Sequence, residues 1–262
     1  MNEMLVIVPS RGRPKNQERF LEYFFKNSVI SDLCFVLDTD DESNYPRFDK
    51  VIYELLEPLM LNEKLNIISS KYCNDYKFIA FIGDDHLLKT YAWDKTLTKP
   101  LLDRIGISYG NDLYKKEELP TCAVLSSSII KHLGYMAPPE LKHSYIDKFW
   151  LDLGLAVNNL NYFEDVVWEH IHPDNKKTEV DETYLRANQG EDFSINFYTK
   201  FAESYKITTP TGTKEYLVSE FTTDYKSQLV QLNSLEHFGN KFGNVNVNDS
   251  NESATHDDER IS

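Results

Sequence analysis

The sequence has few cysteines, no long apolar run and little positive charge. Its three cysteines, Cys34, Cys73 and Cys122, are odd in number and form no CxxC pair, which argues against a disulfide framework and against a structural zinc site. We therefore expect a protein of the reducing cytoplasm. The first apolar run, Leu5–Pro9, is too short for a signal peptide or a membrane span, so no membrane partner is expected.

Positive charge is scarce, because the 262 residues carry 28 Lys and Arg against 42 Asp and Glu, for a net charge of −14. This balance argues against a broad basic face for nucleic acid, although it does not exclude a nucleic-acid substrate that is met locally. The length fits one large domain or two small ones. We expect a core over residues 1–185, an extension packing on it over 186–242, and a disordered acidic tail over 243–262, where Asn, Ser and Asp dominate.

Three short apolar runs, Met4–Val8, Leu33–Leu37 and Phe78–Ile82, are continuous rather than alternating. Such runs are typical of strands that are covered on both faces, as in a parallel sheet with helices on each side. Between them, Arg19–Asn27 and Val51–Leu61 carry apolar residues at helical spacing. The alternation of strands and helices predicts an open α/β sheet.

The patterns farther along the chain extend this alternation. They predict a helix over Trp93–Ile105 that Pro100 divides, strands over Gly106–Asp112 and Leu119–Ser128, a short helix over Ser128–Leu133 closed by Gly134, a helix over Tyr145–Asn158, a last strand over Asp165–His172, and a helix over 190–205 that packs back on the core.

Polar groups follow each of the three apolar runs at the point where the predicted strand ends. The first run leads into Pro9–Pro14, which contains two arginines, the second into Asp38–Glu42, and the third into Gly83–His86. Ligands of open α/β sheets bind beyond the carboxyl ends of the strands. We therefore expect the arginines, the carboxylates and a metal-binding triplet to meet in one cleft.

The triplet Asp84-Asp85-His86 has two interpretations. Residues i and i+2 of an extended chain share a side, so Asp84 and His86 can bind one divalent cation while Asp85 faces a sugar or a ribose. The alternative is a solvated acidic turn. His170 and His172 stand at the same spacing in the last predicted strand. This second pair favours a metal site in which phosphate oxygens complete the coordination shell.

Arg11, Arg13 and Lys15 lie in the loop after the first predicted strand, where fork-shaped and point-charge donors can meet a diphosphate. A solvated basic loop is the alternative, but the scarcity of positive charge favours the binding role. The carboxylates of Asp38–Asp41 can accept hydrogen bonds from a base or from ribose hydroxyls, although such runs are also common in ordinary turns.

These motifs together resemble the family-2-like glycosyltransferases of the GT-A fold, and in particular their small phage-encoded members, over roughly residues 4–185. The resemblance implies an α/β fold with a Rossmann-like, mixed or mostly parallel central sheet flanked by helices. It makes Val6–Pro14 the nucleotide-binding loop and Asp38–Asp41 the group that holds the base or the ribose. The metal-binding D-x-D motif falls on Asp84–His86, here in a D-x-H form that ends in histidine.

The later part of the resemblance concerns the acceptor side of the site. Leu125–Gly134 is similar to the family's strand-to-helix segment before the acceptor site, and His143–Trp150 takes the place of its Glu-Asp motif with the following Trp. The resemblance implies that Asp147 is the general base, with Ile146 in place of the usual acidic neighbour. Taken alone, Asp147 is better explained as a carboxylate that stabilises a helix N-terminus, and only the surrounding pattern makes the base an equal alternative.

The other site residues also follow from the resemblance. The Glu169–Pro173 strand supplies a late metal-binding histidine, for which we select His172 over His170. The predicted metal ligands are Asp84, His86 and His172, and the predicted nucleotide-sugar contacts are Arg11, Arg13, Asp38, Asp85, Asp112 and His143.

The resemblance therefore implies a metal-dependent glycosyltransferase. Such an enzyme moves a sugar from a nucleotide-diphosphate sugar to an acceptor hydroxyl, here with Mn²⁺ or Mg²⁺ as cofactor. We expect inversion at the anomeric carbon because the chain offers a candidate base. A modified DNA base or a glycan is the acceptor that the phage-encoded members suggest. Two alternatives stay open, namely a metal-dependent phosphohydrolase built from the same carboxylates and histidines, and a non-catalytic module that binds nucleotide sugars.

Overall fold

The computed structural model describes residues 1–187, 198, 206–209 and 212–215. The predicted helix over 190–205 and the predicted extension over 186–242 lie largely outside these residues, and the predicted tail over 243–262 lies wholly outside them. Among the described residues, no helix combines the length and the apolar character that crossing a bilayer requires.

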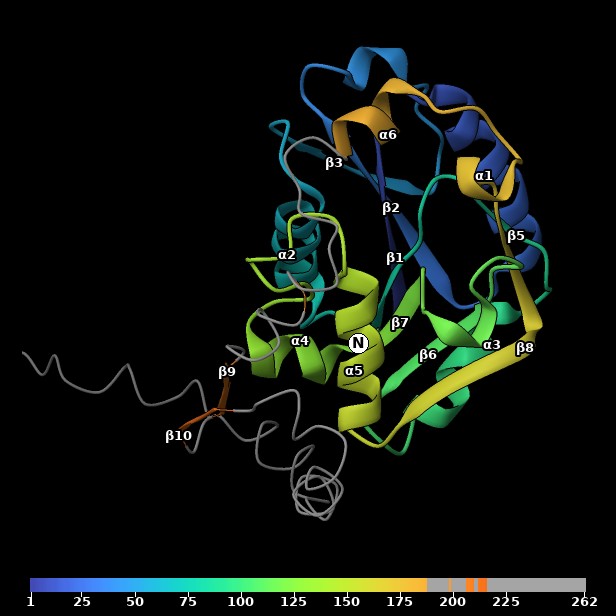
Figure 1. Cartoon of the computed structure of the whole chain (residues 1–262). Coiled ribbons are helices and arrows are strands. Elements are labelled where there is room, and N and C mark those ends of the chain that lie inside the picture. The colour runs from blue at the N-terminus through green and yellow to red at the C-terminus, as the bar shows by residue number, and fades with distance from the viewer. Residues whose placement is uncertain (188–197, 199–205, 210–211, 216–262) are drawn as a thin grey trace, which may run out of the picture.

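The chain alternates strands with helices over most of its described length (Figure 1). In chain order the elements are β1 (Asn2–Ser10), α1 (Pro14–Asn27), β2 (Ser31–Asp38), η1 (Glu42–Asn44), β3 (Val51–Leu56), α2 (Leu61–Tyr72), β4 (Tyr76–Phe81), β5 (His86–Leu88), α3 (Trp93–Thr98), η2 (Lys99–Leu101), β6 (Ile107–Asn111), η3 (Lys116–Glu118), β7 (Ala123–Ser126), α4 (Ser127–Leu133), α5 (Ile146–Ala156), β8 (Leu160–His170), η4 (Pro173–Asn175), α6 (Glu182–Ala187), β9 (Lys206–Thr209) and β10 (Gly212–Glu215).

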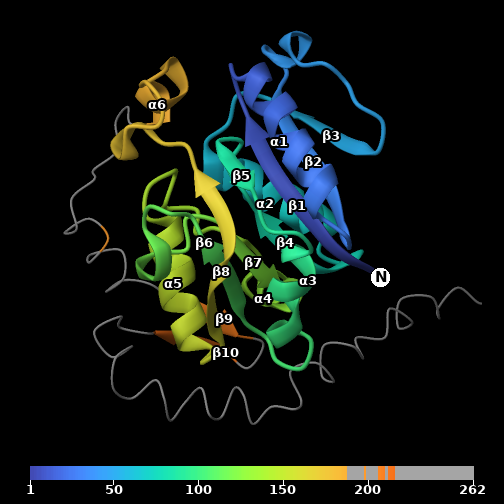
Figure 2. The same cartoon turned by 90° about the vertical axis from the view of Figure 1, so that its right-hand side faces the viewer.

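One eight-stranded sheet has the order β3-β2-β1-β4-β7-β6-β8-β5, and β9 pairs with β10 in a separate hairpin. Strands β1 to β4 run parallel, β7 runs antiparallel to β4 and β6, β8 is parallel to β6, and β5 is antiparallel to β8. The predicted mixed, mostly parallel sheet is therefore confirmed. Because β1, β2, β4, β6 and β8 point the same way, their carboxyl ends meet at one edge, next to α6 (Figure 2).

Helices cover both faces of the sheet, which explains the continuous apolar runs. In β1, Leu5 and Ile7 join the core on the side of α2, α4 and α5, whereas Met4, Val6 and Val8 join the core on the side of α1 and α3 (Figure 1). All five side chains are fully buried. Each face of the strand thus removes apolar area from water, at about 25 cal/mol per Å².

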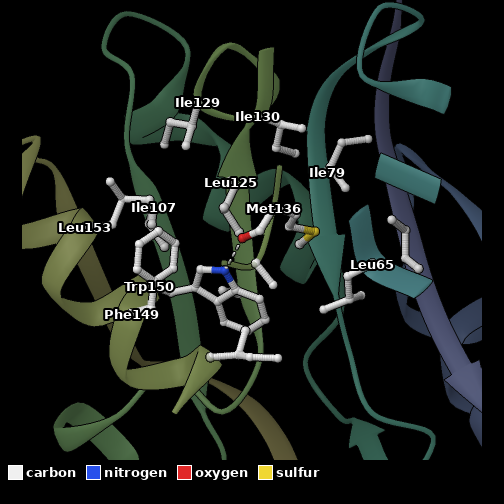
Figure 3. Packing of buried hydrophobic residues seen from close by; sticks show 14 of the residues in the cluster. Leu65, Ile79, Ile107, Leu125, Ile129, Ile130, Met136, Phe149, Trp150 and Leu153 are labelled. Carbon is white, nitrogen blue, oxygen red and sulfur yellow. Dashed lines mark hydrogen bonds between the residues drawn. The ribbon is translucent and has the colours of Figure 1, made fainter. Parts of the chain in front are cut away.

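Trp150 fixes helix α5 against the sheet. Its indole N–H donates a hydrogen bond to the carbonyl oxygen of Met136 at 2.9 Å, and its ring is 1% exposed among residues from α4, α5 and the strands (Figure 3). The ring also lies 5.5 Å, centroid to centroid, from Phe81 at the end of β4. A buried Trp needs a partner for its N–H, and this one holds the first turn of α5 at the carboxyl edge of the sheet.

The predicted helix over Val51–Leu61 is wrong. Val51–Leu56 is instead the edge strand β3, paired in parallel with β2, and helix α2 begins only at Leu61. Val51 packs on the core beside α1, whereas Ile52 packs on the core beside α2, so both faces of the strand carry apolar residues. The same apolar residues also match the spacing of a helical face. In a segment this short, apolar spacing alone does not distinguish a strand from a helix.

The other boundaries differ less from the prediction. Helix α1 begins at Pro14, since proline fits the first helical position. Pro100 does divide its segment, with α3 ending at Thr98 before η2, and Gly134 does close α4, in the left-handed conformation with φ of 82°. Strand β8 ends at His170, so His172 lies outside it.

Candidate active site

A cleft of about 530 Å³ lies at the carboxyl edge of the sheet. Nearly all the residues predicted from the sequence to form the site line this cleft, namely Arg11, Arg13, Asp38, Asp84, Asp85, His86, His143, Asp147 and His172. Asp112 stands behind its wall. The cleft is also lined by Lys64, His170 and Tyr184, which the sequence prediction did not select.

Asp85, His86 and His170 bring ligand atoms within 4.8 Å of one another. The Nδ1 atom of His86 lies 2.9 Å from Asp85 Oδ1, and Nε2 of His170 lies 3.5 Å from Asp85 Oδ2. The two histidines are paired across β5 and β8, which places their rings together. Strand pairing therefore forms this group from residues far apart in the sequence.

Two ring nitrogens of this group are buried without a hydrogen-bond partner, namely Nε2 of His86 and Nδ1 of His170. The second lies 3.9 Å from Asp112 Oδ2, which is too far for a hydrogen bond. Each of these two nitrogens is the other ring nitrogen from the one that lies near Asp85, so it does not face that carboxylate. One carboxylate with two imidazoles is a donor set that fits a divalent transition metal, and the residues present therefore fit such an ion.

The charged side chains of this group shift one another's pKa values. Burial alone lowers the pKa of His170, but the carboxylates of Asp112 and Asp85 outweigh it and raise that pKa to about 9. Burial raises the pKa of Asp85, yet the contact with His170 and the hydrogen bond with His86 outweigh burial and hold that pKa well below its usual range. Burial, with His170 nearby, lowers the pKa of His86. Neutral His86 is the form that can bind a cation.

Asp84 points away from this group. Its carboxylate accepts a hydrogen bond from the Ser10 hydroxyl at 2.5 Å and another from Arg13 Nη1 at 3.3 Å. Burial raises the pKa of Asp84 to about 6, against the lowering effect of Arg13. Asp84 and His86 therefore do not share a side, because Asp84 and Asp85 form a turn before β5 rather than an extended chain.

His172 lies at the rim of the site, beyond the end of β8. Its Nδ1 atom accepts a hydrogen bond from the backbone N–H of Asp174 at 3.2 Å, which caps the short helix η4. Burial, with His170 nearby, lowers the pKa of His172. Its ring centroid lies 4.9 Å from that of His170, so the two rings are neighbours although only His170 belongs to the compact group.

Asp112 supports the group from behind. One carboxylate oxygen accepts hydrogen bonds from the backbone N–H groups of Tyr114, Lys115 and Lys116 at 2.7 to 2.8 Å, and the other accepts one from the Thr121 hydroxyl at 2.9 Å. These donors and His170 outweigh burial and lower the pKa of Asp112. Its role in the structure is to order the loop after β6 and to face His170.

Arg11 and Lys64 share the carboxylate of Asp38. The Nη1 atom of Arg11 donates to Asp38 at 2.7 Å, while its guanidinium also meets Asp40 with both terminal nitrogens. The ammonium of Lys64 forms an ion pair with the other oxygen of Asp38. Asp38 is fully buried and Lys64 nearly so, so a carboxylate expected to hold a base or a ribose instead holds two cations at the cleft floor.

Arg13 is enclosed by acidic and aromatic groups. Besides Asp84, its guanidinium binds both oxygens of Asp181 at 2.7 and 2.8 Å and lies 4.1 Å from the ring centroid of Tyr184. The Tyr184 hydroxyl in turn donates to Asp85 Oδ2 at 2.7 Å. The two predicted diphosphate arginines therefore point into the same cleft, and both are engaged by carboxylates.

Asp147 lies in the first turn of α5 and lines the cleft beside His143. Its Oδ1 atom accepts a hydrogen bond from the Lys148 backbone N–H at 2.8 Å, as a carboxylate at a helix N-terminus does. Burial raises the pKa of the Asp147 carboxyl despite that bond. A raised pKa suits a general base that works near neutral pH.

Four residues of the site are absent from the sequence prediction, namely Lys64, His170, Asp181 and Tyr184. Lys64 carries no local signal, because only its position on the cleft-facing side of α2 distinguishes it from other lysines. Asp181 and Tyr184 lie in a segment of weak pattern and reach the site by a contact with residues far earlier in the chain. His170 was considered, and the position of the end of β8 is the feature that separates it from His172.

No protein-family model matches the chain, and no curated protein matches its sequence. Among solved structures, TarS from S. aureus superimposes with a TM-score of 0.50 at 13% identity over 87% of this chain and 49% of TarS. TarS 1–349 in complex with UDP-GlcNAc gives 0.50 at 13% over 71% and 64%. The mannosyltransferase PcManGT from Pyrobaculum calidifontis, with GDP-Man and Mn²⁺, gives 0.49 at 13% over 65% and 57%.

This chain thus spans less than two thirds of the length of these proteins. At such identities the similarity shows the fold, which is the GT-A fold of nucleotide-diphospho-sugar transferases. The fold class implied by the sequence resemblance is confirmed.

Proposed function

We propose that this protein is a metal-dependent glycosyltransferase that moves a sugar from a nucleotide-diphosphate sugar to an acceptor hydroxyl. The observation that carries the proposal is the cleft at the carboxyl edge of a GT-A sheet, in which two arginines lie beside a buried Asp-His-His group. Positive groups for a diphosphate and ligands for a cation are the two requirements of such a donor site.

Asp85, His86 and His170 are the proposed metal ligands. This set replaces Asp84 and His172 of the sequence prediction, because Asp84 bonds Ser10 and His172 caps η4. Two imidazoles favour Mn²⁺ over Mg²⁺, since magnesium prefers carboxylate and water ligands. When bound, the cation supplies charge neutralisation for the departing nucleoside diphosphate.

Arg11, Arg13 and Lys64 are the proposed cationic side of the donor site. The buried carboxylate of Asp38 holds Arg11 and Lys64 in place at the floor of the cleft. Prepositioned donors stabilise developing charge without reorganising during the reaction, which is the larger part of their effect. The arginine fork fits two phosphate oxygens, whereas the lysine acts as a point charge.

Asp147 is the proposed general base. Its carboxylate accepts the proton of the acceptor hydroxyl while the acceptor oxygen forms a bond to the anomeric carbon, and the bond from that carbon to the diphosphate oxygen breaks with its electron pair. Attack opposite the leaving group inverts the anomeric centre. Asp112 would keep His170 oriented during this step, as a supporting carboxylate does for a ligand histidine.

The fold similarity supports a nucleotide-sugar donor, because TarS, which shares the fold, forms a complex with UDP-GlcNAc. For the donor, the proposal is limited to the class of nucleotide-diphosphate sugars and names neither the sugar nor the base. For the acceptor, the sequence resemblance gives a hydroxyl on a modified DNA base or on a glycan.

Thermal unfolding with a panel of nucleotides, each with and without Mn²⁺, tests the donor site. We expect a nucleoside diphosphate to raise the unfolding temperature only when Mn²⁺ is present, and Asp85→Asn to abolish that increase. Asp165→Asn removes an exposed carboxylate from β8 outside the cleft and should preserve it. Indifference to every nucleotide would refute the donor site.

Hydrolysis of nucleotide sugars then identifies the donor. A slow, Mn²⁺-dependent release of the nucleoside diphosphate from one nucleotide sugar is expected when water replaces the acceptor. Phosphate release from simple esters without donor cleavage would favour the phosphohydrolase, for which the described residues provide one metal-binding group rather than two. Donor binding without any cleavage or transfer would favour the binding module.

A further inference from the structure

The guanidinium of Arg13 is held by carboxylates within the protein. Its Nε and Nη2 atoms donate to the two oxygens of Asp181, and its Nη1 atom donates to Asp84 at 3.3 Å and lies 3.8 Å from Asp85. The Arg13 side chain is only 10% exposed. A guanidinium has five N–H donors in one fixed fork, so a diphosphate cannot take the fork of Arg13 while Asp181 holds it.

The segment that contains Asp181 also contacts Arg11 and the proposed metal group. The Tyr184 ring covers the Arg13 guanidinium, and its hydroxyl donates to Asp85, the carboxylate of the proposed metal group. The Thr183 hydroxyl donates to the carbonyl oxygen of Arg11 at 2.8 Å. Residues 181–184 therefore touch both arginines and the metal group at once.

A bidentate carboxylate on an arginine has the geometry of a phosphate on that arginine. We infer that residues 181–184 form an autoinhibitory gate, in which Asp181 stands in for a donor phosphate on Arg13 and must leave before the donor's diphosphate can bind. The inference rests on the proposed function, because the displacing ligand is the diphosphate of the donor. It adds that the donor site is closed by the chain itself when no donor is present.

Hydrogen bonds connect Asp181 to the first turn of α6. Asp181 accepts hydrogen bonds from two amides at the start of α6, through its carboxylate from Tyr184 N–H and through its backbone carbonyl from Leu185 N–H, both at 3.1 Å. Displacing Asp181 from Arg13 therefore loosens the first turn of α6. Binding of the ligand shifts the gate only by the difference in its affinity for the two states.

The first arm of the test compares binding of UDP and of inorganic pyrophosphate, each with Mn²⁺, by calorimetry on the full chain. Asp181→Ala should bind both probes about five- to tenfold more tightly than the unaltered chain, because the internal competitor is gone. Glu182→Gln removes one negative charge from the adjacent, exposed residue and should leave both affinities within about twofold. Tyr184→Phe keeps the ring, removes the contact with Asp85 and should tighten binding as well.

The second arm follows hydrogen exchange of the Tyr184 and Leu185 amides in the unaltered chain. Saturating UDP with Mn²⁺ should speed their exchange several-fold, since the gate opens when the ligand enters. Slower or unchanged exchange in the bound state, or equal or weaker binding by Asp181→Ala, would overturn the gate and leave the donor site standing. Failure of every variant and of the unaltered chain to bind either probe would overturn the proposed function and the gate together.

Discussion

The rings of His86 and His170 stack with their centroids 4.0 Å apart and their planes inclined by 21°. The two residues are direct partners in the antiparallel pairing of β5 with β8, so the sheet itself sets their separation. Asp85 reaches both rings from the turn before β5. Two imidazoles held side by side next to one carboxylate form a site whose geometry depends on strand register rather than on a local motif.

Removal of either stacked histidine should abolish stabilisation by metal. At a Mn²⁺ concentration about a hundred times Kd, binding adds about 2.7 kcal/mol of stability and raises the unfolding temperature of the unaltered chain by about 5 to 10 °C. His86→Ala and His170→Ala should lose most of this increase, each measured against its own metal-free transition. Mg²⁺ should give a smaller increase than Mn²⁺ at the same concentration.

His172→Ala is the matched comparison for this prediction. It removes a neighbouring imidazole that caps η4 and lies outside the compact group. The metal-induced increase should survive in His172→Ala. Loss of the increase in His172→Ala together with its survival in His170→Ala would restore the ligand set predicted from the sequence.

The framework of the sheet could be predicted because its physical signal is local. Runs such as Met4–Val8 and Leu33–Leu37 are apolar at every position, and only a strand with cover on both faces buries all of them. The edge strand Val51–Leu56 has partly exposed faces and no such signature. Its apolar spacing fits a helix as well, and pairing with β2 decides between the two.

The cleft could be predicted from the polar residues that follow the strands, but their partners could not. Asp38 was expected to face a ligand, yet it binds Arg11 and Lys64, and the register of α2 that brings Lys64 there has no local marker. Likewise, the choice between His170 and His172 depends on where β8 ends. Contacts of this kind are tertiary, so spacing along the chain does not determine them.

Asp147→Asn should separate binding from catalysis. We expect its rate of sugar transfer to fall at least about 100-fold, which is the usual contribution of a general base, while its affinity for UDP with Mn²⁺ stays within about twofold. Asp152→Asn, on the same helix, is the control, because Asp152 pairs with Lys148 and does not line the cleft. An unchanged transfer rate in Asp147→Asn would leave the carboxylate with its helix-stabilising role alone.

The pH dependence of sugar transfer should reflect the raised pKa of the Asp147 carboxyl. A general base works when deprotonated, so activity is lost as the pH falls through its pKa. Burial raises the pKa of Asp147, so the acid limb of kcat/KM should lie above the value of about 3.9 that an ordinary aspartate would give. An acid limb at the same pH in the residual activity of Asp147→Asn would assign that limb to another group.

Lys64→Met should cost far more stability than Lys71→Met, although both lysines lie on α2 and both pair with a carboxylate. Lys64 is nearly buried with Asp38, whereas the Lys71 side chain is 54% exposed beside Glu54. Breaking a buried pair leaves an uncompensated charge, and with Arg11 still on Asp38 we expect a loss of about 3 kcal/mol. The exposed pair should contribute less than about 1 kcal/mol.

Urea unfolding of the two variants and of Lys64→Met combined with Asp38→Asn checks this difference. The double variant should be less destabilised than the sum of its single variants, because neutralising Asp38 removes the unpaired charge. Equal losses for Lys64→Met and Lys71→Met would show that Lys64 is solvated and does not form the floor of the cleft.

Gly110→Ala should disturb both the sheet and the metal group. A Cβ atom at Gly110 would lie 2.5 Å from the carbonyl oxygen of Val166, at the register shift where β6 passes β8. Backbone atoms cannot turn aside as a flexible side chain can, so we expect a loss of about 2 to 3 kcal/mol in urea unfolding. Because β6 leads into Asp112, whose carbonyl oxygen accepts from the His170 N–H at 3.0 Å, the displacement should also weaken Mn²⁺ binding.

Gly134→Ala is the control for a glycine change away from the cleft, since its φ of 82° costs stability but its surroundings are open. Calorimetry should therefore give Gly134→Ala the Mn²⁺ affinity of the unaltered chain, and an equally unaffected Gly110→Ala would show that strand register does not control the metal group.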